Sequence, residues 1–495
     1  MNGAETIAVS CEEMPEIARA VLADGGRMQM AYAWLPEPEV VELRYLASPA
    51  EGGRFLLWSC RPDGEAPSLA AIWPSLGWYE REIMDLFGLS FREHPEPNRL
   101  VLGENIPPPF RDGGRAGGDP RGRGADVPRG LPLLDQPEVQ LLPFGPVRAD
   151  VLESAEFNFY YVGERILHYH PHLFFKHRGM ESRFAGLASG AGAVMAERVS
   201  GVGSVAHALA YAQAVEAAFV AEVPRRALYL RVLLAELERL YNHLHYLGHL
   251  AGTTTLRVAE AEGKLLEERV KQLNGRLTGS RFLRGIVTPG GLRRDLAPER
   301  WLWSALTDLR SKTARYVDLL ERSDSHRDRL ITTGQLSRRV ARDQGATGPV
   351  QRASGIDRDL RRDHPYAAYA ELPLVVPVRE EGDAYARALV RAGEIEASFV
   401  LIQRVLMQLE EGPVHQALPA AEGLGAEGLG WAESPRGTLF YAVHFESDGN
   451  LQRVKIKSPS FSNWRVFPFT VHETNMMDYA INEASFGLTI AGCAR

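Results

Sequence analysis

The 495-residue sequence contains only three cysteines and no long hydrophobic run. Cys11, Cys60 and Cys493 lie far apart and share no CxxC spacing, so they predict neither a disulfide framework nor a four-thiolate metal cluster. No stretch of about 18 apolar residues occurs, so we expect no transmembrane helix. The net charge of −7 argues against nucleic acid as a partner, because phosphate-binding surfaces usually carry a basic excess.

The residues that are present have the balance of an ordinary globular protein, with 45% apolar and 24% charged residues. At about 100–200 residues per domain, the length predicts two to four domains. Residues 1–110 are predicted to form a small α/β scaffold domain, because short apolar runs alternate with glycine, proline or charged breaks. The predicted strands cover residues 28–35, 40–46, 55–59 and 69–72, and the predicted helices cover 12–22 and 78–87, with Gly88 as the cap of the second.

A second, larger domain is predicted after a linker. Residues 111–140 begin with a stretch rich in glycine, proline and arginine, which cannot bury a core and therefore predicts a linker. Residues 141–495 begin with alternating apolar and polar residues that predict β hairpins, followed by long helical periodicities. The predicted fold class is α+β. The expected long helices cover 205–223, 225–250, 256–277, 298–322 and 383–411, and the expected late strands cover 439–445 and 454–456.

The helix at 78–87 carries the first informative motif, within WYEREIMDLFGLSFREHPEPNRL at 78–100. Glu80, Arg81, Glu82 and Asp85 crowd this short helix, and composition alone predicts a solvated face. The string resembles the signature of the small, metal-free peripheral-arm subunit of respiratory complex I, which also occurs in related membrane-bound hydrogenases. For residues 1–110 the resemblance implies assembly without a cofactor.

Seven segments of the larger domain carry a second resemblance. They resemble, in order, the large subunit of energy-converting, membrane-bound nickel–iron hydrogenases, a homologue of the quinone-site subunit of complex I. The segment RASGIDRDLRRDHPYAAY at 352–369 is most similar to the formate-hydrogenlyase type. The resemblance implies a hydrogenase-large-subunit-like fold. The segments cover 145–153, 177–181, 197–216, 224–244, 281–296, 352–369 and 433–437.

The metal-binding motifs of that family have lost their cysteines here. The family holds its nickel–iron centre with four thiolates, two from each of two motifs, and soft thiolates suit such a centre. Ser200 and Gly203 stand at the cysteine positions of the first motif, and Thr489 and Gly492 at those of the second. We therefore expect no metal and no cofactor bound by the chain's own ligands.

Two residues at chemically useful positions remain. The resemblance assigns Glu181 to the family's proton gate, and burial could raise its pKa into the range of proton transfer. It assigns Arg436 to the arginine above the metal site. The alternatives are an ion-pair role for Glu181 and, for Arg436, a bidentate bond to Asp357 or Glu433.

Arg148 and His207 are the candidates for a quinone or acceptor pocket. Arg148 lies near the tip of a predicted hairpin, where complex I carries a quinone-contacting histidine, and His207 follows the first lost motif. An ordinary core position is the alternative for His207. A separate alternative places a metal on the histidines of YHPHLFFKHRGME, which are His170, His172 and His177.

The resulting prediction is a peripheral-arm subunit of an NADH-quinone-oxidoreductase-like or hydrogenase-like complex, on the cytoplasmic face of the plasma membrane. It would couple electron transfer from an iron–sulfur small subunit, holding a 4Fe-4S cluster, to a possible quinone acceptor or to proton or ion translocation. A ferredoxin-like subunit and membrane-embedded ion-translocating subunits are the other expected partners. The alternatives are a structural subunit with a closed cavity and a working hydrogenase. No GxGxxG follows a strand, so the sequence does not support direct nicotinamide binding by this chain. Use of NAD(H) by the complex as a whole is left open.

Overall fold

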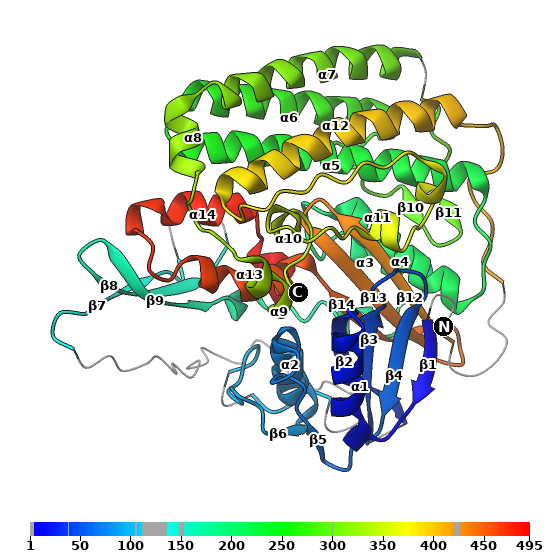
Figure 1. Cartoon of the computed structure of the whole chain (residues 1–495). Helices are drawn as coiled ribbons and strands as arrows, with labels where there is room; N and C mark the ends of the chain where they lie inside the picture. The colour runs from blue at the N-terminus through cyan, green and yellow to red at the C-terminus, as the bar shows by residue number, and fades with distance from the viewer. Residues whose placement is uncertain are drawn as a thin grey trace.

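The computed structural model describes residues 4–37, 39–103, 106–110, 136–147, 153–298, 300–419 and 426–495. The N-terminal unit is built on a four-stranded sheet in the order β1-β4-β3-β2 (Figure 1). Helix α1 (Met14–Ala23) turns its buried Met14, Ala18 and Val21 inward, which is the stripe expected at helical spacing. The strands are β1 (Ala4–Ala8), β2 (Arg27–Glu37), β3 (Val40–Ser48) and β4 (Phe55–Cys60).

Two predictions for this unit are wrong. The predicted strand at 69–72 is a turn that leads into a short 3-10 helix, η2 (Pro74–Leu76). The sequence predicted no disulfide framework, but Cys11 and Cys60 form a disulfide with a Cα–Cα distance of 5.2 Å. They meet because β1 runs parallel to β4, so the residues that follow β1 lie beside the end of β4. Pairing between strands decides which cysteines become neighbours, whatever their separation in sequence.

Helix α2 (Gly77–Phe87) also differs from expectation, because its charged side chains are buried rather than solvated. Asp85 accepts hydrogen bonds from three successive backbone amides, at residues 100–102, and Glu80 accepts from Ser68 and the amide of Leu69. Gly88 ends the helix in the left-handed conformation, with φ 68°. The two remaining short strands of the unit, β5 (Glu65–Pro67) and β6 (Ser90–Arg92), pair in parallel.

The larger unit begins with the predicted hairpins, which form a three-stranded antiparallel sheet in the order β7-β8-β9. β7 (Gln140–Phe144) starts at the last residue of the expected linker, of which residues 111–135 lie outside the described residues. β8 (Glu156–Val162) and β9 (Arg165–His172) follow.

Four long helices pack together as a bundle in the larger unit, and the sequence predicted each of them (Figure 1). Adjacent helices in this bundle pack along leucine-rich stripes. They are α5 (Arg225–Thr253), α6 (Arg257–Thr278), α7 (Arg300–Glu321) and α12 (Ala384–Gln408). The shorter helices are α3 (Ser189–Ala196), α8 (Asp324–Leu330), α9 (Arg338–Asp343), α10 (Pro349–Ala353), α11 (Leu360–Asp363), α13 (Pro459–Val466), α14 (Tyr479–Phe486) and α15 (Ile490–Ala494).

A late antiparallel sheet, β12-β13-β14, packs against helix α4 (Ser204–Ala218). Gly428 and Gly430 of β12 allow this close approach, because a Cβ at either position would collide with backbone carbonyl oxygens of α4. The strands are β12 (Glu427–Ser434), β13 (Gly437–Phe445) and β14 (Leu451–Lys457).

The two units share a hydrophobic core. Phe55 of β4 packs edge-on against Phe440 of β13, with ring centroids 5.3 Å apart. No helix of the described ranges combines the length and the hydropathy that a membrane span requires.

Candidate functional site

Three of the four residues that the sequence analysis assigned to the family's cysteine positions line one small cavity. Ser200 and Gly203 come from the loop before α4, Arg436 from the turn between β12 and β13, and Gly492 from α15. The free volume is about 20 Å³, which is room for one or two water molecules. The other lining residues are Val202, His207, Ser434, Pro435, Ser458, Pro459 and Ser460.

Thr489, the fourth of these positions, lies directly behind the lining. Its hydroxyl caps helix α15 by accepting from the amide of Gly492 at 3.2 Å, and it lies 3.2 Å from the hydroxyl of Ser460. The two motifs, nearly 300 residues apart in the sequence, therefore come together through loops that precede helices.

Arg436 reaches this cavity without a carboxylate partner among the described residues. Its Nε donates to the carbonyl of Gly487 and its Nη1 to Oδ1 of Asn242, each at 2.7 Å. The alternative bidentate bond is wrong, because Asp357 pairs with Arg362 and Glu433 pairs with Arg352. Burial, followed by repulsion from Arg391, lowers the pKa of Arg436 to about 10, so the guanidinium keeps its charge at neutral pH.

His207 is 3% exposed, and its Nδ1 lies 2.8 Å from the hydroxyl of Tyr441. Burial lowers the pKa of His207 to about 3, with a further contribution from Arg178, so the ring is neutral. A Cβ built on Gly203 would lie 3.4 Å from Cδ2 of the ring. His207 is therefore both a buried residue and part of the cavity wall.

Glu238 of α5 is a buried carboxyl group at the same site that the sequence analysis missed. It accepts hydrogen bonds from the amides of Val205 and Ala206, at 2.7 and 3.0 Å, in the first turn of α4. Burial raises its pKa to about 7, against the opposing effect of those bonds and of Arg436. A carboxylate inside an otherwise leucine-rich helix was the available signal, because such residues are rarely buried without a role.

Glu181 lies in a different environment. It pairs with Arg453 at 2.9 Å and with Lys455 at 3.1 Å, and it accepts a bond from the amide of Ile456. Burial would raise its pKa, but the charges of Lys455, Arg453 and Arg495 outweigh burial and hold the pKa at about 2. The expectation of a raised pKa is wrong, and the ion-pair alternative describes the contacts of this residue.

The donor set does not fit a nickel–iron centre. Cys493 is the one free cysteine; it is fully buried, and burial raises the pKa of its thiol. Within the described ranges no three His, Cys, Asp or Glu side chains are arranged to hold a metal. The three-histidine alternative also does not form, because His177 donates to the carbonyl of Ala494 at 2.6 Å, whereas His170 and His172 lie together on β9.

Arg148, the hairpin candidate for quinone contact, lies outside the described residues. Its role stays a prediction, as do the roles assigned to Glu181, Arg436 and His207.

Comparison with protein families matches three parts of the chain. Residues 9–118 match the respiratory-chain NADH dehydrogenase 30 kDa subunit, and residues 264–427 match the 49 kDa subunit of the same enzyme. Residues 178–267, which include the loop before α4, match the nickel-dependent hydrogenases.

Formate hydrogenlyase subunit 5 of Escherichia coli (strain K12) is 30% identical over 438 residues, which cover 84% of this chain and 74% of that protein. The chain belongs to the family of fused 30 kDa and 49 kDa complex I-type subunits. The fused C/D 2 protein of the NADH-quinone oxidoreductase of Aquifex aeolicus (strain VF5) is 28% identical over 499 residues, covering 88% of this chain and 84% of that protein.

A solved structure shows the same fold. A chain of the membrane-bound sulfane sulfur reductase, an archaeal respiratory membrane complex, aligns with a TM-score of 0.67 and 27% identity, over 72% of this chain and 99% of that chain. The predicted fold class, a small N-terminal domain joined to a larger hydrogenase-like domain, is therefore confirmed. As a fused complex I-type subunit, the chain has relatives that are subunits of oxidoreductase complexes.

Proposed function

We propose that this chain is a metal-free peripheral-arm subunit of a membrane-associated, complex-I-like or hydrogenase-like oxidoreductase. It couples the arrival of electrons on a neighbouring iron–sulfur subunit to proton or ion translocation by other subunits. The observation that carries the proposal is the cavity lined by Ser200, Gly203 and Gly492, where the family's thiolates would stand. Hydroxyl groups and glycines are poor ligands for a centre that needs soft donors.

The coupling role rests on the buried carboxyls beside the cavity. Glu238 has a pKa of about 7, so a change of charge nearby can load or release its proton at physiological pH. Glu433 also has a pKa of about 7, raised by burial and by Asp359. Its partner Arg352 belongs to a fully buried network that also contains Glu394 and connects β12 with α12. An electron on an adjacent cluster would raise both pKa values and favour proton uptake.

A quinone-type acceptor is the second candidate, because Arg436 and His207 bring polar groups to the cavity without an anionic partner at hydrogen-bonding distance. A volume of about 20 Å³ does not admit a quinone ring, so the segments that carry Ser200 and Pro459 would have to move apart. The small volume of the cavity favours the coupling role over acceptor binding.

The decisive experiment purifies the native complex through a tag on this chain and identifies its subunits, metals and quinones. We expect an iron–sulfur small subunit, a ferredoxin-like subunit and membrane-embedded subunits, with iron in the complex but no nickel on this chain. Nickel in a one-to-one ratio with this chain would contradict the proposal.

Glu238→Gln in native membrane vesicles tests the coupling role. We expect fewer ions translocated per electron while electron transfer continues. Glu222→Gln, at an exposed position beyond α4, is the matched control. We expect it to change neither the rate of electron transfer nor the number of ions translocated per electron. An unchanged ratio in Glu238→Gln would leave a structural role for this region.

A further inference from the structure

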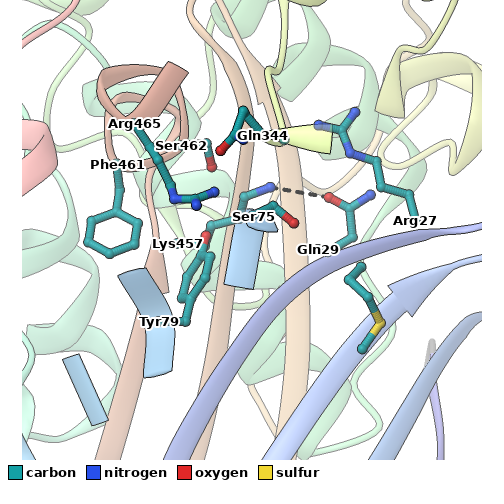
Figure 2. Close-up of a pocket in the computed structure, with 11 residues that line it drawn as sticks. Arg27, Gln29, Ser75, Tyr79, Gln344, Lys457, Phe461, Ser462 and Arg465 are labelled. Carbon is teal, nitrogen blue, oxygen red and sulfur yellow. Dashed lines mark hydrogen bonds between the residues drawn. The ribbon is translucent and has the colours of Figure 1, made fainter. Parts of the chain in front are cut away.

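A second pocket, which shares no lining residue with the candidate site, lies at the junction of the two units (Figure 2). The N-terminal unit contributes Arg27 and Gln29 of β2. The larger unit contributes Lys457, at the end of β14, and Arg465 of α13. In Figure 2, Arg465 and Arg27 approach from opposite sides and Lys457 lies between them. The remaining lining residues are Met28, Ser75, Tyr79, Gln344, Gly345, Phe461 and Ser462.

Three cations line this pocket, and none of its lining residues is acidic. None of the ion pairs formed by the described residues includes Arg27, Lys457 or Arg465. Lys455, only two residues before Lys457, by contrast contacts both Glu82 and Glu181. The pocket is therefore a local excess of positive charge, which is costly to bury without a counter-ion.

Lys457 is the most strongly buried of the three, with 2% of its surface exposed. Among the described residues its ammonium donates to neutral oxygens alone, those of Gln29 at 3.1 Å and Thr438 at 2.6 Å. Burial and the charge of Arg27 lower the pKa of Lys457 well below its ordinary value. A lysine in this position either loses its proton or keeps it against an anion.

Arg465 has buried donors without an acceptor in the described part of the chain, and Arg27 donates to neutral acceptors. Nε and Nη1 of Arg465 are buried and have no hydrogen-bond partner among the described residues. Arg27 donates to Oε1 of Gln351 at 2.5 Å and to the carbonyl of Ala346, both of them neutral acceptors. Unsatisfied buried guanidinium donors indicate a missing acceptor.

The size of the pocket limits that acceptor. The free volume is about 10 Å³, which holds one water molecule or an ion of similar size. Phosphate, sulfate and carboxylate ligands are larger than this space. A halide is somewhat larger than water but much smaller than these ligands, so a small outward shift of the lining side chains admits it. It also accepts hydrogen bonds from several directions.

We propose that this pocket binds a small inorganic anion of the halide class, which joins the N-terminal unit to the larger unit through Arg27, Lys457 and Arg465. The anion neutralises the excess charge and accepts the free hydrogens of Arg465. Because the lining comes from both units, occupancy stabilises their association. This proposal is independent of the redox role, since no lining residue belongs to the cavity described above.

Thermal unfolding of the full chain in chloride and in gluconate, at constant ionic strength, tests the proposal. We expect a saturable rise in Tm of about 2 °C or more with chloride, because a ligand that binds only the folded state stabilises it. Lys457→Met should abolish the rise. Lys264→Met, at an exposed position on α6, is the matched control and should keep it. An equal rise in Lys457→Met, or no rise in the parent chain, would overturn the proposal.

A crystal grown in bromide provides a second test that needs no variant. We expect an anomalous peak between Lys457 and Arg465. Only water at that position would overturn the proposal. If sulfate at equal ionic strength stabilises the protein saturably and in a Lys457-dependent manner, the halide assignment is wrong.

Discussion

Glu181 and Glu238 are both buried carboxyl groups of the larger unit, but their surroundings shift their pKa values in opposite directions. Glu181 faces Arg453, Lys455 and Arg495 and has a pKa of about 2. Glu238 accepts hydrogen bonds from two backbone amides and contacts no cation among the described residues. Its pKa is about 7.

The difference separates a fixed charge from an exchangeable proton. Glu181 holds together a cluster that includes Glu82 of the N-terminal unit, so its charge serves the junction of the two units. The carboxyl group of Glu238, from α5, lies at the N-terminus of α4. The helix dipole and two amide hydrogen bonds there stabilise the carboxylate, but they offset only part of the cost of burying its charge. Of the two, Glu238 is the group that can exchange a proton near neutral pH.

The largest effect is expected for Glu181→Gln. Removing this charge leaves three buried cations with only Glu82 as a partner, so we expect a loss of about 3–5 kcal/mol in the free energy of unfolding. Denaturant unfolding at pH 7 measures it. Because the folded pKa lies below the ordinary value of 4.5, this stabilisation is present above pH 4.5 and is lost as the pH falls toward 2.

Glu473→Gln is the control for that measurement. Glu473 pairs with Arg165 at 3.3 Å on the surface, and its side chain is 73% exposed. Such pairs contribute less than about 1 kcal/mol. An equally small loss for Glu181→Gln would mean that the cluster is not needed for stability.

Glu238→Gln should change the pH dependence of stability. The folded pKa of about 7 lies above the ordinary value of 4.5, so the folded state binds more protons than the unfolded state between these values. Stability contributed by Glu238 is therefore complete below pH 4.5 and is lost as the pH rises through 7. The free energy of unfolding should therefore fall between pH 5 and 8, and in the variant this fall should be smaller by on the order of 2–3 kcal/mol. Unfolding measurements from pH 5 to 8 test this. Identical pH profiles for the two proteins would place the exchangeable proton elsewhere.

The two glycines at predicted cysteine positions, Gly492 and Gly203, also differ in their surroundings, because a Cβ would be crowded at one and not at the other. A Cβ at Gly492 would lie 2.5 Å from the hydroxyl of Thr489, which caps α15. Gly492→Ala is therefore expected to lower the free energy of unfolding by about 1–3 kcal/mol. Retention of the parental urea midpoint would show that the cap can move.

Gly203→Ala should have the smallest effect. The added Cβ would make an ordinary contact of 3.4 Å with His207, and the backbone at Gly203 has a negative φ. We expect a change within about 0.5 kcal/mol, compared side by side with Gly492→Ala. A loss as large as that of Gly492→Ala would mean that both sides of the cavity are packed equally tightly.

Sequence reasoning was accurate for the long helices because their apolar stripes are local patterns. It predicted α5, α6, α7 and α12 within a few residues at most of their ends. It missed β1, whose partner β4 lies about 50 residues further along the chain, and it gave a strand to residues 69–72. Apolar runs of this length adopt a strand or a turn according to the partners that the tertiary structure supplies.

Only part of the candidate site could be predicted from the sequence. Motif positions identified Ser200, Gly203 and Gly492, and the structure places all three around one cavity. Neither the partners of Glu181 nor the proximity of Glu238 to Val205 follows from spacing, because each contact joins segments more than 30 residues apart.

The sequence alone determined the family, the four long helices and the lack of four cysteines that could hold a metal centre. Residue identity and periodicity are properties of the chain itself. The tertiary structure decided which carboxyl group keeps its charge, which cysteines pair, and where cations gather without partners. These outcomes depend on burial and on the distances between charges from remote segments, and both arise only when the chain is folded.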